Sequence, residues 1–317
     1  METAKGIPQA EHARPAFKNK RPGKTGRSLR VKNRLIGWSF VLLSVLLISI
    51  FYFYPMVSAL LLSFQSGAGT NLDFVGLDNY IRLFGDPTFL AAVKNTVIYL
   101  LIQVPLMIFL ALLISVLLND KKLLAKGWFR TAIFLPCVTS LVAYSVIFKY
   151  MFGTDGLINV MLLNLSIVSQ PIQWLTDPFW AKVTIIIAIT WRWTGYNMIF
   201  YLSSLQNIDS SIYEAAKIDG ASVVQRFFKI TIPLLKPIIL FTSITSTIGT
   251  LQLFDEVMNI TGGGPGNATL TISQYIYNLS FKYTPDFGYA ATVSYAIVVL
   301  IVFFSILQFR VAGDKNA

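Results

Sequence analysis

The sequence predicts an all-α, polytopic membrane protein with six transmembrane helices and both termini in the cytoplasm. First, 55% of the 317 residues are hydrophobic, only 13% are charged, and the mean hydropathy is +0.62, which is too apolar for a soluble domain of this size. Second, the chain contains six apolar runs of the roughly 20 residues that a helix needs to cross a bilayer. These predicted spans are Leu35–Met56, Thr96–Leu118, Thr131–Phe152, Ala181–Leu205, Ile238–Val257 and Ala290–Phe309.

The distribution of basic residues predicts the orientation of these spans. Of the 26 Lys and Arg residues, 20 lie before the first span, after the second span, after the fourth span or after the last one. Acidic residues divide almost evenly between the two sides, as expected when Lys and Arg alone set the topology. The net charge of +11 is therefore explained by membrane orientation, and we expect no nucleic-acid partner.

Residues 1–34 form a basic tail ahead of the first span. Pro8, Pro15 and Pro22 and the low apolar content predict a disordered cytoplasmic segment. Its expected role is to set topology and to contact anionic lipid head groups, with a specific protein partner as the less favoured alternative. Residues 35–317 are then one transmembrane domain. Its single cysteine, Cys137, excludes an internal disulfide and suggests no metal cluster.

The cytoplasmic loop 206–236 is predicted to carry two short helices. Ser211 and Glu214 fit a capping box, and the helix they begin should run to Asp219 and stop at Gly220. A second helix fits residues 222–229. Two helices exceed what a connection between antiparallel spans requires, so the loop is predicted to dock a soluble partner. The simpler alternative is an ordinary helical connector.

The same loop resembles the cytoplasmic signature of permease subunits of binding-protein-dependent ABC importers. The match consists of Glu214-Ala215-Ala216, three residues, Gly220, nine residues, and Ile230-x-Ile232-Pro233. Ile232 stands where the family usually has leucine. Three other segments resemble the carbohydrate branch, the maltose and glycerol-3-phosphate permease group. They are Phe74–Tyr80, the run from Phe254 to Pro265 with its three glycines, and Phe287–Ala290.

This resemblance implies a type I ABC importer permease fold in a bacterial or archaeal plasma membrane. It implies four kinds of partner: a second related permease, two ATP-binding cassette subunits, an extracytoplasmic solute-binding protein and a sugar. The chain lacks a Gly-x-x-x-x-Gly-Lys-Ser/Thr phosphate loop, so it is expected to be no enzyme and to bind no cofactor itself. ATP and Mg²⁺ belong to the partner subunits. The residues implied to couple the chain to the ATPase are Glu214, Ala215, Ala216, Asp219 and Gly220.

The fourth and fifth spans supply the residues expected along the substrate pathway. Sugars are held by aromatic faces and by planar hydrogen-bonding groups, and the resemblance places the sugar between these two spans. The candidates are Trp191, Arg192, Tyr196, Asn197, Ser246, Thr250 and Gln252. Packing and membrane-belt roles are the alternative for the aromatic residues. For Arg192 a structural role, either an ion pair with Asp255 or Glu256 or snorkelling, is favoured over recognition of an acidic or phosphorylated sugar.

Two other functions remain open at this stage. An ion-coupled secondary carrier would need buried carboxylates in its spans, which are nearly free of acids here. An ABC importer permease for an amino acid, a polyamine or an ion is the nearer alternative.

Overall fold

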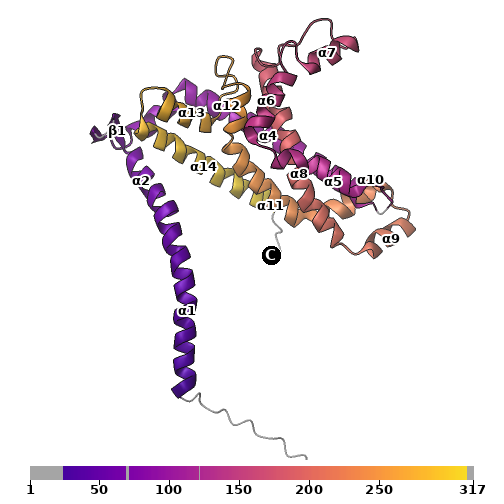
Figure 1. Cartoon of the computed structure of the whole chain (residues 1–317), viewed down its shortest axis with the longest axis horizontal. Helices are drawn as coiled ribbons and strands as arrows, with labels where there is room; N and C mark the ends of the chain where they lie inside the picture. The colour runs from indigo at the N-terminus through magenta and orange to yellow at the C-terminus, as the bar shows by residue number, and fades with distance from the viewer. Residues whose placement is uncertain (1–23, 69–70, 121, 313–317) are drawn as a thin grey trace, which may run out of the picture. The chain divides into compact units, whose positions relative to one another are not determined.

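A computed structural model describes residues 24–68, 71–120 and 122–312, which are almost entirely helical (Figure 1). It divides the chain into two units, one ending at Val57 and one beginning at Ser58. A two-stranded antiparallel sheet corrects the all-α prediction. The elements are α1 Lys24–Ile48, η1 Ser49–Phe53, α2 Tyr54–Ser63, β1 Gln65–Ala68, β2 Asn71–Phe74, α3 Asp78–Gly85, α4 Pro87–Asn119, α5 Lys126–Val138, α6 Leu141–Met151, α7 Leu157–Asn164, α8 Pro178–Gln206, α9 Ser210–Ile218, α10 Val223–Arg226, η2 Phe227–Thr231, α11 Ile232–Leu251, α12 Asp255–Ile260, α13 Ile272–Tyr277, η3 Asn278–Lys282 and α14 Phe287–Ala312.

The first unit is an apolar helix with no protein covering it. Helix α1 covers the described residues from Lys24 onward, ahead of the predicted span, and contains no proline. Residues 24–34 of the predicted disordered tail are therefore helical, and the rest of that tail lies outside the described residues. All side chains of residues 36–57 are exposed. So large an apolar surface requires lipid or another protein around it.

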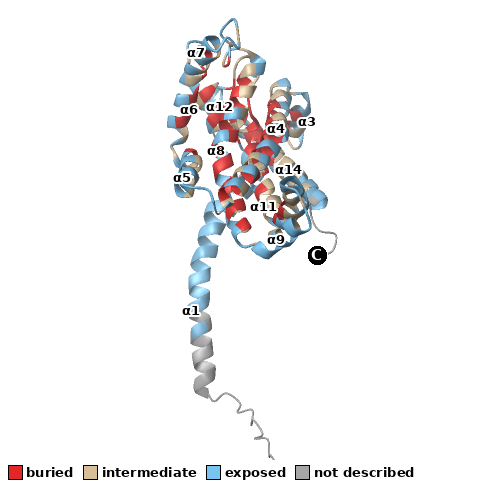
Figure 2. Ribbon diagram, turned by 90° about the vertical axis from the view of Figure 1, so that its right-hand side faces the viewer, coloured by how far each residue is buried: buried red, intermediate tan, exposed pale blue. Residues whose placement is uncertain are grey.

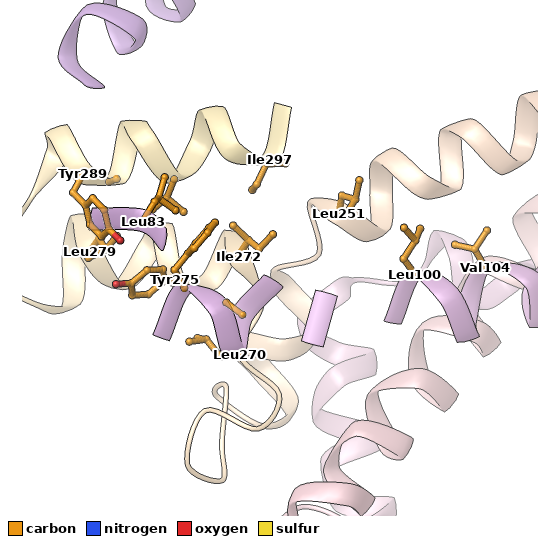
Figure 3. Close-up of a cluster of buried hydrophobic side chains, with 14 residues drawn as sticks. Leu83, Leu100, Val104, Leu251, Leu270, Ile272, Tyr275, Leu279, Tyr289 and Ile297 are labelled. Carbon is orange, nitrogen blue, oxygen red and sulfur yellow. The ribbon is translucent and has the colours of Figure 1, made fainter. Parts of the chain in front are cut away.

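The second unit is built around α4, which packs against α8, α11 and α13. Buried residues concentrate where these helices face one another (Figure 2). One buried cluster joins α4 to α13 and α14 through residues such as Leu100, Ile272 and Tyr289 (Figure 3). In both views α9 lies at one end of α8 and α11, and α12 lies at the other (Figures 1 and 2).

Helices α5 and α8 approach unusually closely at Gly195. A Cβ atom added there would overlap the carbonyl oxygen of Ile133. Only a residue without a side chain permits this approach, since a helix backbone cannot be shifted cheaply. Gly195 thus fixes how α5 packs on α8.

Four helices among the described residues are long and apolar enough to cross a membrane, and the pair α5 and α6 would make a fifth. The predicted third span is not one straight helix, because α5 and α6 meet at an angle of 99°. Pro136 lies near the break and weakens the helical hydrogen bonding there. Helix α8 has 29 residues, which is long enough to cross a membrane, but its composition is too polar for it to be one of these candidate spans. Six spans and cytoplasmic termini remain predictions.

The fifth predicted span begins earlier than its apolar run. Residues 223–251 are continuously helical through α10, the π-helical turn η2 and α11. The second predicted loop helix is therefore the start of this long helix. Pro233 follows the π-helical turn η2 directly, and this local change of helical hydrogen bonding accommodates a residue without an amide hydrogen. Motion of the loop can pass directly into α11 as a result.

A polar network ties α3, α4, α13 and α14 together at the end that carries α12. Asp86 caps α4 by accepting hydrogen bonds from the amides of Thr88 (2.8 Å) and Phe89 (3.2 Å). Its other oxygen accepts from the hydroxyls of Tyr275 (2.5 Å) and Tyr289 (2.7 Å). Burial favours the neutral acid, but these hydrogen bonds outweigh it and lower the pKa of Asp86.

Replacing Asp86 should weaken this network in a pH-dependent way. Because the folded-state pKa lies below the ordinary value of about 3.9, the ionised carboxylate stabilises the fold above that value. This contribution is lost as the pH falls through the folded-state pKa. We expect Asp86→Asn to cost about 1 kcal/mol at pH 7. Thermal unfolding in detergent should show a difference from wild type that shrinks below pH 4, whereas Asp78→Asn, at an exposed acid in α3, should show none.

Candidate functional site

A cavity of about 560 Å³ opens between α4, α8, α11 and α12. Its walls combine aromatic rings, amides, hydroxyls and carboxylates. The lining residues are Gln103, Met107, Leu141, Ile189, Trp193, Tyr196, Asn197, Thr245, Ser246, Gly249, Thr250, Gln252, Leu253, Phe254, Asp255 and Glu256. This mixture suits a polyhydroxylated ligand with some apolar C–H surface.

Five of the seven predicted pathway residues line this cavity. They are Tyr196, Asn197, Ser246, Thr250 and Gln252. The Thr250 hydroxyl donates to Oε1 of Gln103 (3.0 Å) and is also within hydrogen-bonding distance of the Ser246 carbonyl (2.9 Å), which links α11 to α4. The structure thus brings the fourth and fifth predicted spans together around one space.

Trp191 does not line the cavity, which corrects its predicted placement. Its ring packs against Tyr144 and Phe148 of α6, with centroids 6.2 and 5.4 Å away. Trp193 lines the cavity instead, and its ring meets the Tyr196 ring edge-on, with the two ring centroids 5.8 Å apart. Residues three or four apart share a helix face, so Trp193 lies with Tyr196 while Trp191 faces elsewhere.

Arg192 is not among the residues that line the cavity, and its hydrogen bonds are to backbone carbonyls rather than to acids. Its guanidinium donates to the carbonyls of Cys137 and Thr139, at 3.2 Å each. These carbonyls lie at the break between α5 and α6, where helical partners are lost. The group also lies over the Tyr144 ring, 4.9 Å from its centroid. An ion pair with Asp255 or Glu256 was expected, but Arg192 forms none with either acid.

Sequence reasoning missed Gln103, Trp193 and the cavity-facing position of Glu256. Gln103 is 2% exposed and Glu256 is 4% exposed. A glutamine amid the apolar run of α4 was a usable signal, because a polar side chain at that depth needs a partner. Glu256 carried no such signal, since only the fold shows that α12 turns back over the cavity.

The loop of residues 206–236 forms the predicted helix with a different cap. Asp209, not Ser211, caps α9 by accepting from the Ser211 amide at 2.9 Å. The capping box belongs instead to Ser222 and Gln225 at the start of α10. The predicted stop is confirmed, since Gly220 has a left-handed φ of 77°. The Ala221 amide donates to the Ala216 carbonyl at 2.9 Å, completing a Schellman cap.

The surface of this loop is open and apolar. Glu214 and Gly220 are exposed, and so are Ile218 (86%), Val223 and Phe228. Helix α9 is tied to the long helix behind it by a 3.1 Å hydrogen bond between the hydroxyls of Tyr213 and Thr231. Since Thr231 is buried, this contact joins the exposed helix to the core.

Comparison with known proteins identifies the family. Residues 87–313 match the family described as the inner membrane component of binding-protein-dependent transport systems. The chain belongs to this family. It is a permease subunit of an ABC importer and a multi-pass inner membrane protein, not an enzyme, which excludes the secondary-carrier alternative.

Two curated relatives and one solved structure are similar along most of the chain. The lactose transport system permease protein LacF of Rhizobium radiobacter is 60% identical, over 88% of this chain and 95% of that protein. The arabinooligosaccharides transport system permease protein AraP of Halalkalibacterium halodurans is 36% identical, over 86% of this chain and 87% of that protein. A bacterial ABC transporter involved in the import of the acidic polysaccharide alginate shares the fold, with a TM-score of 0.76 and 23% identity. The match covers 91% of this chain and 98% of the transporter's chain.

Proposed function

We propose that this chain is the subunit through which an ATP-driven importer moves a sugar or oligosaccharide across the inner membrane. The observation that carries the proposal is the cavity between α8 and α11, whose aromatic and amide lining suits a sugar. Its relatives, named for lactose and for arabinooligosaccharides, support the same class of cargo. They also argue against an amino acid, a polyamine or an ion.

The proposed assembly contains a second related permease, two ATP-binding cassette subunits and an extracytoplasmic solute-binding protein. The exposed face of α9 would seat against an ATPase subunit through Glu214, Ala215, Ala216, Asp219 and Gly220. The apolar helix of residues 36–57 would lie against lipid or the second permease. ATP and Mg²⁺ would bind to the ATPase subunits. Residues 35–317 would form the permease domain, with its coupling loop at 206–236.

In the proposed cycle, closure of the ATPase pair moves α9 as a rigid body. The Tyr213–Thr231 contact and the continuous helix from Val223 to Leu251 would carry this motion toward the cavity. That helix ends at the cavity, where residues 252–254 separate α11 from α12. A shift of α11 would therefore open the cavity alternately to the two sides of the membrane.

Replacing Trp193 should weaken sugar handling, because its ring faces the cavity. We expect Trp193→Ala to lower the rate of lactose uptake about tenfold, as loss of a stacking aromatic costs roughly 1–2 kcal/mol. The measurement is uptake by proteoliposomes that contain the purified complex, with saturating solute-binding protein. Trp191→Ala is the matched control, since that ring lies on the same helix but packs against α6. Equal loss in both variants would contradict the site, and absence of lactose-stimulated ATP hydrolysis in wild type would contradict lactose as cargo.

A further inference from the structure

The cavity lining carries two acids and no basic residue, and its buried amide Asn197 has an unpaired acceptor. Building on the proposed function, we infer that the cavity selects neutral sugars and rejects anionic ones, with Asn197, Asp255 and Glu256 as the specificity-determining residues. Neither the fold nor the coupling loop carries this information.

Asn197 supplies an acceptor that needs a donor from outside the protein. The residue is 1% exposed, and its amide nitrogen already donates to the Trp193 carbonyl (3.1 Å) and to the Met107 sulfur (3.3 Å). Within the described chain its Oδ1 atom has no partner, although the residue lines the cavity. A buried acceptor left unpaired costs about 1–3 kcal/mol, so a ligand hydroxyl that donates to it is favoured.

Two of the lining's polar side chains, Gln103 and Thr250, bond one another, while the hydroxyls of Tyr196 and Ser246 and the amide of Gln252 line the cavity with no hydrogen-bond partner in the described chain. The Gln103 amide nitrogen donates to the Met107 sulfur at 3.2 Å, and its oxygen accepts from Thr250. A sugar hydroxyl can donate to the free acceptor, whereas a carboxylate or sulfonate on a ligand brings further acceptors only. Hydrogen bonding therefore favours a polyhydroxylated ligand, and discrimination between neutral and anionic sugars depends on the charge of the lining.

The charge of the lining acts in the same direction. Asp255 lies exposed on the lining, and Glu256 is buried in it. The lining has no Lys or Arg. Burial disfavours the charged form of Glu256 and the nearby Arg192 only partly restores it, so the exposed Asp255 carries the negative charge that no basic lining residue offsets. This negative charge would repel an anionic ligand, and like charges at close range cost several kcal/mol.

The fold does not by itself decide this selectivity, since the structurally similar alginate transporter is described as importing an acidic polysaccharide. Charge selectivity must therefore come from particular side chains. In this chain the acids come from α12 and the amide from α8, and both meet at the cavity.

The test uses the complete complex in lipid nanodiscs without the solute-binding protein, so that only the permease selects. Calorimetric titration would compare lactose with lactobionate, a disaccharide acid of similar size that carries one negative charge. We expect wild type to bind lactose at least tenfold more tightly. The double variant Asp255→Asn/Glu256→Gln should reduce this ratio at least fivefold. Asp78→Asn, at an exposed acid outside the cavity, should leave the ratio unchanged.

Two further measurements distinguish charge exclusion from a change in shape. The wild-type ratio should fall as ionic strength rises, and the ratio of the double variant should not. Asp255→Lys alters only an exposed side chain, and it should favour lactobionate even if the buried Glu256 tolerates no change. Wild-type binding of both sugars with equal affinity, or an unchanged ratio in the double variant and in Asp255→Lys, would overturn the inference while leaving sugar transport intact. A wild-type complex that neither binds lactose nor hydrolyses ATP in response to it would instead overturn the proposed function.

Discussion

Gly220→Asp is expected to lower sugar uptake at least tenfold while leaving membrane insertion and ATP hydrolysis in place. Gly220 has a φ of 77°, and no other atom lies within 4 Å of a Cβ built on it. The fold therefore has room for the new carboxylate, and aspartate tolerates left-handed backbone better than most residues. An ATPase cleft closed around a bare backbone would not have room for it. The measurement is uptake per ATP hydrolysed in proteoliposomes.

The control for Gly220→Asp separates docking from backbone strain. Gly266 has a similar left-handed φ of 54° and equally open surroundings, but it lies in the loop that follows α12. Gly266→Asp imposes the same strain at the opposite end of α11, so it should leave α9 and its partner unaffected. Copurification of the ATPase should fall for Gly220→Asp and not for Gly266→Asp. Wild-type uptake by Gly220→Asp would rule out this loop as the coupling surface.

Arg192→Met is expected to destabilise the subunit by about 3 kcal/mol and to lower the yield of assembled complex. The substitution leaves the carbonyls of Cys137 and Thr139 without their charged donor at the break between α5 and α6. Each unpaired carbonyl in a water-poor setting costs about 1–3 kcal/mol. Arg192→Lys should recover only part of the loss, because an ammonium group cannot bridge two carbonyls as a planar guanidinium does. Thermal unfolding in detergent and the yield of complex are the measurements.

Lys182→Met provides the matched control for Arg192→Met. It removes a basic side chain from the same helix, where no hydrogen bond to the α5–α6 break depends on it. It should leave stability and assembly close to wild type. If Arg192→Met instead assembles normally and loses uptake only of anionic sugars, Arg192 recognises substrate and the structural role assigned to it is wrong.

Much of the fold was accessible from sequence because membrane insertion imposes strong local rules. The apolar runs containing Thr96 and Ala290 lie within α4 and α14, and the stop at Gly220 has the backbone conformation that glycine permits. The cap of α9 was misplaced by two residues, since Asp209 and Ser211 are both good capping residues and helix ends are poorly marked. The break of the third span was missed because the sequence is apolar on both sides of it, in α5 and in α6.

The candidate site likewise has features that follow from local sequence and features that depend on tertiary packing. Composition and charge distribution by themselves indicated a polytopic membrane protein, and the resemblance of the loop from Glu214 to Pro233 indicated an importer permease, because each depends on residues near one another in the chain. Only the tertiary structure decided that Trp193 rather than Trp191 faces the cavity, that Arg192 holds a distant break, and that Glu256 joins the lining. Periodicity shows which residues share a face of one helix, but which neighbour covers that face depends on packing between segments far apart in sequence.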